Sequence, residues 1–140
     1  MPDAQQLRDT FEQQYQLGIP QLDKIHGEFV TLLNDTLTSV DSDFGRHLQR
    51  LYEHTQLHFF EEEARMTAFG FDGLQAHQDD HNRILQKLEA LSASVAAGDL
   101  DSARSWLNKE LPNWFDGHTR NMDGAAVAWV LEHSAEGAMI

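Results

Sequence analysis

Histidine and carboxylate side chains occupy several positions at which the helical apolar pattern of this chain would otherwise place a hydrocarbon side chain. One histidine and a glutamate lie four residues apart, two further histidines lie four apart, and another histidine precedes an aspartate by five. The full set is His26, His58, Glu62, His77, His81, His118 and Asp123. Imidazole and carboxylate together suit iron, zinc, copper or manganese. The pattern therefore predicts a buried metal site.

Each of these residues also has a simpler interpretation when taken alone. An inward histidine is more often a hydrogen-bonded core residue than a ligand. Glu62 lies in the acidic run 61–63 and could face solvent, and Asp123 could end a frayed helix. Burying all seven without compensation would cost several kcal/mol per group, whereas a domain is stable by only about 5–15 kcal/mol. A bound metal supplies the compensation.

The number of candidate ligands favours two ions over one. Five histidines and two carboxylates exceed what one ion with an open position can accept, but they fit a pair of ions if both carboxylates bridge. With three histidines on one ion, two on the other and one solvent-derived oxygen between them, the coordination numbers are roughly six and five. The five-coordinate ion can then bind a small diatomic molecule.

The elements that position these residues are four predicted amphipathic helices. Apolar residues recur at helical spacing over about 19–37, 44–66 and 74–95, and a fourth helix is expected from Asp99, with Pro112 kinking or breaking it. Short connections between them predict an all-α, up-down-up-down four-helix bundle. The expected division of a single domain, 1–140, is an N-terminal arm over 1–18, the bundle over 19–124 and a C-terminal tail over 125–140.

Composition narrows the function classes. The formal net charge is −13, with ten scattered Lys and Arg residues, which argues against nucleic acid and anionic membranes as partners. The absence of cysteine removes disulfides and thiolate metal sites. The N-terminus lacks the pattern of a signal peptide, and no apolar run approaches the roughly 20 residues of a membrane span. A cytoplasmic protein is expected.

The same motifs resemble the hemerythrin family, in particular its bacterial single-domain members. Gly18-Ile19-Pro20 through His26 resembles the family's entry into the first helix, and the segment 58–66 resembles its H-F-x-x-E-E-x-x-M signature. The pair His77 and His81 fits H-x-x-x-H, and the segment 114–123 fits W-x-x-x-H-x-x-x-x-D.

The resemblance implies roles that the spacings do not. His77, His81 and His118 would hold a six-coordinate iron, and His26 and His58 the iron that binds oxygen. The aromatic residues expected around the site are Phe29, Phe59, Trp114 and Phe115. Phe115 stands where the family usually carries a leucine over the oxygen site. His54 stands where a tyrosine is common, and we expect it to be a hydrogen-bond donor to the site or a polar end residue rather than a spare ligand.

The implied function is reversible binding of O2 as a hydroperoxide at one of two irons, for storage, delivery or sensing. NO, azide and peroxide are further ligands to expect. One alternative is a di-iron peroxidase or oxidase, although no Glu lies three residues before a His, as the E-x-x-H pairs of ferritin-like oxidases require. Another is a regulatory module that responds to iron or oxygen.

Overall fold

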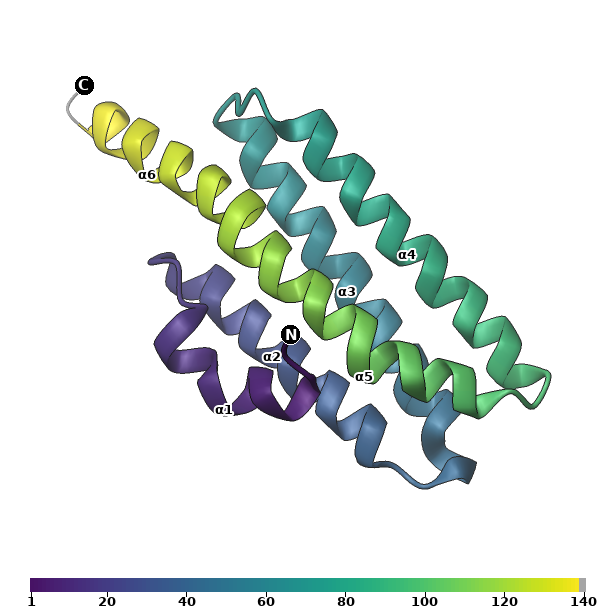
Figure 1. Cartoon of the computed structure of the whole chain (residues 1–140). Helices are drawn as coiled ribbons and strands as arrows, with labels where there is room; N and C mark the ends of the chain where they lie inside the picture. The colour runs from purple at the N-terminus through teal and green to yellow at the C-terminus, as the bar shows by residue number, and fades with distance from the viewer. Residues whose placement is uncertain (139–140) are drawn as a thin grey trace.

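The computed structural model describes residues 1–138, with side chains through Ser134. These residues form six α-helices and one π-helical segment and contain no strand. Their order is α1 (Ala4–Gln14), α2 (Pro20–Thr38), α3 (Asp41–Ala68), α4 (Leu74–Ala96), α5 (Leu100–Gly117), η1 (His118–Asp123) and α6 (Gly124–Ala138). Helices α2, α3, α4 and α5 lie side by side as a bundle, which confirms the predicted all-α four-helix fold (Figure 1). No helix in this part of the chain combines the length and apolarity needed to cross a lipid bilayer.

Each bundle helix buries one apolar stripe, and the stripes meet in a common core. Leu33 of α2, Leu48 of α3, Leu88 of α4 and Leu107 of α5 are completely buried. Each such side chain stabilises the fold by roughly 1.5–3 kcal/mol. The seven predicted ligands lie near the start of α2, the end of α3, the start of α4 and the segment η1 that directly follows α5. Because neighbouring helices are antiparallel, these four positions coincide at one end of the bundle.

The predicted N-terminal arm contains a helix of its own, α1. Asp3 caps it reciprocally with Gln6: the Gln6 N–H donates to the Asp3 carboxylate, and the Asp3 N–H donates to the Gln6 side chain. Leu7 and Tyr15 are buried, and α1 packs against both α2 and α5. The segment is therefore a packed element of the fold rather than a loose arm.

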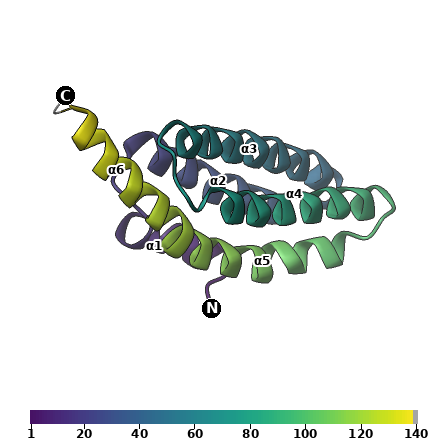
Figure 2. The ribbon, with the colours of Figure 1, turned by 90° about the horizontal axis from the view of Figure 1, so that it is seen from above.

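The fourth helix of the bundle is longer than predicted and is not broken at Pro112. In both views it runs without a loop from α5 through η1 into α6 (Figures 1 and 2). Pro112 removes one helical hydrogen bond and leaves the carbonyl of Asn108 without its partner. Asn108 is exposed, so water can satisfy that carbonyl at little cost.

Most of the segment expected as a C-terminal tail is helix α6. Ala126, Val127 and Val130 of this helix are buried against the end of the bundle. Trp129 also links α6 to the end of α3, because its indole N–H donates to the carbonyl of Phe69 at 2.7 Å. Residues 139–140 of the predicted tail lie outside the described residues.

Candidate metal centre

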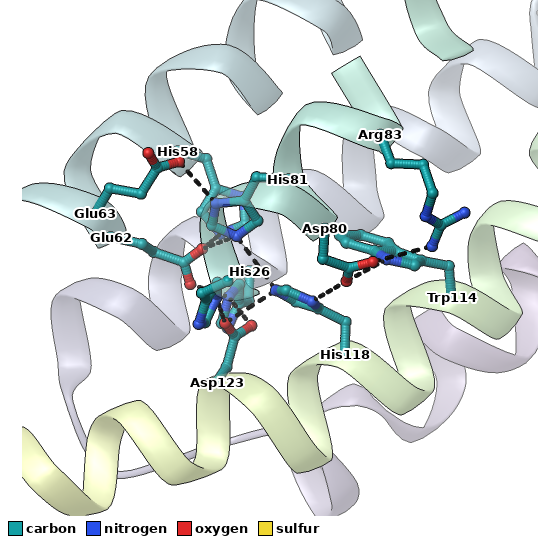
Figure 3. Close-up of polar contacts among 11 residues, drawn as sticks. His26, His58, Glu62, Glu63, Asp80, His81, Arg83, Trp114, His118 and Asp123 are labelled. Atoms are coloured by element: carbon teal, nitrogen blue, oxygen red, sulfur yellow. Dashed lines mark hydrogen bonds and ion pairs between the residues drawn. The ribbon is translucent and has the colours of Figure 1, made fainter. Parts of the chain in front are cut away.

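All seven predicted ligand residues come together inside the bundle, and Figure 3 labels each of them except His77. Every one of them is at most 6% exposed. Their side chains form two groups that could each hold a cation, with ligand atoms within 4.8 Å of one another, and Glu62 belongs to both. One group comprises Glu62, His77, His81, His118 and Asp123, and the other comprises His26, His58 and Glu62. The arrangement offers two adjacent candidate cation sites, one with three histidines and one with two.

The two carboxylates lie between these groups. Asp123 Oδ1 is 2.8 Å from His77 Nε2 and 3.2 Å from His118 Nε2, while its Oδ2 is 3.2 Å from His26 Nε2. Asp123 therefore presents one oxygen to each group.

Glu62 also contacts histidines of both groups, although its two oxygens are not divided one to each group. Its Oε1 is 3.1 Å from His58 Nε2 and 3.3 Å from His81 Nε2, and its Oε2 is 3.2 Å from His26 Nε2. Each carboxylate thus contacts histidines of both groups, which is the geometry that two bridging ligands require.

Hydrogen bonds among the described residues do not account for this cluster. His58 Nε2, His77 Nε2, Glu62 Oε1 and Asp123 Oδ1 are buried and lack a hydrogen-bond partner there, although oppositely charged or polar atoms lie close by. The atoms point toward shared positions rather than along donor–acceptor lines. Buried polar atoms are almost always satisfied, so the donor set fits bound cations.

Two further carboxylates set the tautomers of two histidines. His81 Nδ1 lies 2.9 Å from Glu63, and His118 Nδ1 lies 2.6 Å from Asp80. A carboxylate accepts, so both Nδ1 atoms carry the proton, and in the neutral rings both Nε2 atoms present lone pairs. Those two Nε2 atoms are 3.2 Å apart. Two facing lone pairs repel unless a cation lies beside them, and the paired carboxylates also make each imidazole a stronger ligand.

The π-helical segment places His118 and Asp123 on the same face. Five residues along an α-helix correspond to a rotation of about 140° away from alignment, since the helix has 3.6 residues per turn. A π-helix bonds each residue to the fifth along the chain, and η1 spans His118–Asp123. The local change of helix type therefore turns a spacing of five into a pair of neighbouring ligands.

The four aromatic residues predicted around the site divide between the two groups. Phe115 stacks on Phe29 with ring centroids 5.3 Å apart, and its centroid is 5.9 Å from that of His26. Phe59 stacks on His81 at 3.7 Å while also lying 5.3 Å from His58, and Trp114 stacks on His118 at 4.5 Å. The pair of phenylalanines covers the two-histidine group, and the other two rings brace the three-histidine group.

Comparison with known proteins agrees with this geometry. Residues 17–130 match the family model described as the hemerythrin HHE cation binding domain. The chain belongs to the hemerythrin family. It is 33% identical over 120 residues to a bacteriohemerythrin of Ralstonia nicotianae, and the matched residues make up 86% of this chain and 87% of that protein. It is 31% identical over 107 residues to a myohemerythrin of Sipunculus nudus, covering 76% and 84% of the two chains. No solved structure matches the chain significantly.

Two contributors to this hemerythrin site were missed by sequence reasoning, Glu63 and Asp80. Each directly adjoins a predicted ligand, Glu62 or His81. Consecutive residues on a helix point about 100° apart, so adjacency in sequence gave no reason to place them at the site. Asp80 also accepts from the Trp114 indole N–H at 2.8 Å. Trp114 offered a weak signal, because a half-buried indole N–H requires an acceptor.

His54 lies beside the cluster without joining either cation group. Its ring centroid is 6.2 Å from that of His58, and its Nδ1 is buried without a hydrogen-bond partner among the described residues. Burial lowers its pKa, and the nearby His58 lowers it further. His54 therefore adjoins His58 but lies outside both candidate cation groups.

The electrostatics of the cluster reflect mutual neutralisation of its members. Burial lowers the pKa of His26, but hydrogen bonds to Asp123 and Glu62 outweigh it and raise that pKa to about 10. Burial raises the pKa of Glu62, and the surrounding histidines more than reverse this, so the carboxyl pKa lies well below its ordinary value. The pKa of Asp123 is likewise lowered by His118, His26 and His77 against burial and the neighbouring Glu62. The histidines and carboxylates of the cluster thus favour each other's charged forms.

Proposed function

We propose that this hemerythrin-family chain binds two iron ions and takes up dioxygen reversibly, for storage, delivery or sensing. His77, His81 and His118 would hold one iron, His26 and His58 the other, and Glu62 and Asp123 would bridge them. The observation that carries the proposal is the contact of each buried carboxylate with histidines of both groups. A single ion would have no need of that arrangement.

Iron is favoured by both the donor set and the chemistry. Five imidazoles and two carboxylates suit iron, whereas structural zinc sites usually close at four ligands. Two ferrous ions can together supply the two electrons that hold dioxygen in a reduced form. The unequal division of histidines leaves the ion beside His26 and His58 with fewer protein ligands, so dioxygen would bind there.

The residues around the two-histidine group favour release over further reaction. Phe29 and Phe115 are at most 2% exposed and form a continuous apolar wall beside His26. Such a wall excludes water and small anions such as azide, which slows the proton transfers that would leave both irons oxidised. Neither Phe29 nor Phe115 carries a hydrogen-bond donor that would help to break the O–O bond.

The experiment is an optical titration of the iron-loaded protein. The protein is reduced without oxygen, exposed to air, and then returned to an oxygen-free atmosphere. A visible charge-transfer band that appears with oxygen and disappears on its removal is the expected result. A band that fades in air while added peroxide and a reducing dye are consumed would instead identify a peroxidase, and a protein carrying one zinc would exclude both activities.

A further inference from the structure

A cluster of polar side chains joins the end of helix α1 to the π-helical segment η1. The Tyr15 hydroxyl donates to Asp116 Oδ1 at 2.6 Å, and Arg120 Nε donates to the same oxygen at 2.9 Å. Arg120 also donates to the Gln14 side chain, and its guanidinium carbon lies 5.1 Å from the centre of the Tyr15 ring. We call these four residues, Gln14, Tyr15, Asp116 and Arg120, the Tyr15 cluster.

The cluster connects parts of the chain that are far apart in sequence. Tyr15 is the C-cap of α1, Asp116 lies near the end of α5, and Arg120 lies inside η1. The Tyr15 side chain is 2% exposed and its ring centroid lies 5.5 Å from that of Phe115, so the ring is held in the core while the hydroxyl reaches Asp116. The cluster therefore holds η1 from outside that segment.

The π-helical geometry of η1 needs support, because π-helices are rare and occur mostly as single turns inside α-helices. In η1 the Gly124 N–H donates to the Thr119 carbonyl, five residues back. In an α-helix His118 and Asp123 would point about 140° apart, and the same change would move Arg120 relative to the rest of the cluster. The contacts of the cluster therefore favour the helix type that brings the two ligands together.

Within the cluster, the Tyr15 hydroxyl makes the contact that joins η1 to a separate helix. The ion pair between Asp116 and Arg120 joins residues four apart whose side chains are 31% and 46% exposed, so the pair alone contributes little to stability. The hydrogen bond from Tyr15 to Asp116 spans 101 residues of sequence. Its acceptor is a carboxylate, which makes it one of the stronger kinds of hydrogen bond.

We propose that the Tyr15 cluster positions the metal centre, by holding η1 so that His118 and Asp123 face the cation positions together. Tyr15 belongs to neither candidate cation group, so it is a positioning residue and not a ligand. Loss of its hydroxyl should weaken metal binding although every ligand is retained. The inference rests on the proposed function only in taking iron as the resident metal, and it does not depend on what the iron then binds.

The first test measures backbone hydrogen exchange in the iron-loaded protein by mass spectrometry. Tyr15→Phe keeps the ring against Phe115 and removes only the hydroxyl. Peptides that cover residues 118–124 should exchange several-fold faster in this variant, because local opening of η1 becomes easier, while peptides from α4 should not change. Unchanged exchange over 118–124, or equally faster exchange throughout the bundle, would overturn the proposal.

The second test measures the iron retained against a competing chelator at fixed pH. Tyr15→Phe should retain iron several-fold less well than the wild type. Asn34→Ala is the matched control, since the Asn34 side chain donates to the Ala4 carbonyl at 2.9 Å and ties the other end of α1 to α2. The control should lose stability without losing iron. Equal iron retention in the two variants would mean that Tyr15 does not position η1.

A double-mutant cycle assigns the effect to one hydrogen bond. Asp116→Ala removes the acceptor, so adding Tyr15→Phe to it should lower iron retention no further. Effects that add would show that Tyr15 acts through another contact and would overturn the proposal. A wild-type protein that holds two irons, loses them several-fold more readily as Tyr15→Phe, and never shows a reversible oxygen band would overturn the proposed function and leave this inference intact.

Discussion

At the scale of single residues, the two sites differ in what supports their histidines. Two of the three histidines in one group donate to carboxylates, Glu63 and Asp80. In the other group, Nδ1 of His26 and of His58 has no partner among the described residues. Anionic acceptors make imidazole a better ligand and stabilise higher charge on a metal. We infer that the three-histidine ion is held more tightly than its neighbour.

Asp80→Asn tests this support directly. The variant keeps an acceptor near His118 but removes its charge, so iron at the three-histidine position should bind roughly 10–100-fold more weakly. The measurement is iron retained against a competing chelator at fixed pH. Asp79→Asn is the control, because Asp79 is the exposed neighbour and accepts from the Gln75 side chain rather than from a ligand histidine. Equal iron retention in the two variants would show that Asp80 does not support the site.

Phe115→Ala tests the apolar wall. Removing a fully buried phenylalanine should destabilise the protein by about 3–5 kcal/mol. The opened space should admit solvent and anions beside His26, so the variant should autoxidise faster and bind azide faster. Both rates are measured by stopped flow on protein with full iron content.

Phe44→Ala is the matched variant for this comparison. Phe44 is equally buried but lies at the start of α3, in the half of the bundle away from the site. It should lose a similar amount of stability with no change in either rate. Unchanged autoxidation and azide binding in Phe115→Ala would mean that the ring does not guard the metal position.

At the scale of elements, the four bundle helices and their ligand stripes could be predicted from periodicity, since each buries one face. Helix α1 could not, because its apolar residues Leu7, Phe11 and Tyr15 are few and are separated from the main pattern by the Gly18 turn. The five-residue spacing of His118 and Asp123 fits the π-helical segment. It does not fit an α-helix, in which residues five apart lie on different faces. Pro112 predicted a kink or break in the fourth helix. The packing of this long helix outweighed that local preference.

Leu7→Ala tests whether α1 is part of the packed fold. Leu7 is completely buried, so its truncation should cost about 2–5 kcal/mol, while an unpacked arm would tolerate it. Chemical denaturation gives the free energy of unfolding, and Gln5→Ala, an exposed position on the same helix, should change it little. Iron content should be the same in both. A Leu7→Ala protein as stable as wild type would show that α1 does not contribute to the core.

At the scale of the whole molecule, the balance between protons and metal determines how stability depends on pH. Without metal, the pKa of His26 is raised to about 10. Its contribution to the stability of the folded protein is therefore complete below its unfolded pKa of about 6.5. That contribution is lost as the pH rises toward 10. The lowered pKa values of Glu62 and Asp123 stabilise the folded state above about pH 4. That stabilisation is lost on further acidification.

The metal-free and iron-loaded proteins should therefore differ in how their stability depends on pH. Between about pH 9 and pH 6.5 the metal-free protein should gain stability as the pH falls, because folded His26 keeps a proton that the unfolded chain releases in this range. The iron-loaded protein should lose stability below about pH 6.5, since protons compete for the imidazole nitrogens. Thermal unfolding of both forms across this range measures the two trends. Parallel curves would contradict competition between protons and iron at this cluster.

The central prediction for this molecule is a pair of iron ions that share both buried carboxylates, Glu62 and Asp123. Anomalous diffraction from crystals of the iron-loaded protein, recorded on both sides of the iron absorption edge, tests this most directly. We expect two peaks of similar height about 3–4 Å apart, one beside His77, His81 and His118 and the other beside His26 and His58, each in contact with Glu62 and Asp123. A single peak, or two peaks with either carboxylate bound to one ion alone, would contradict it.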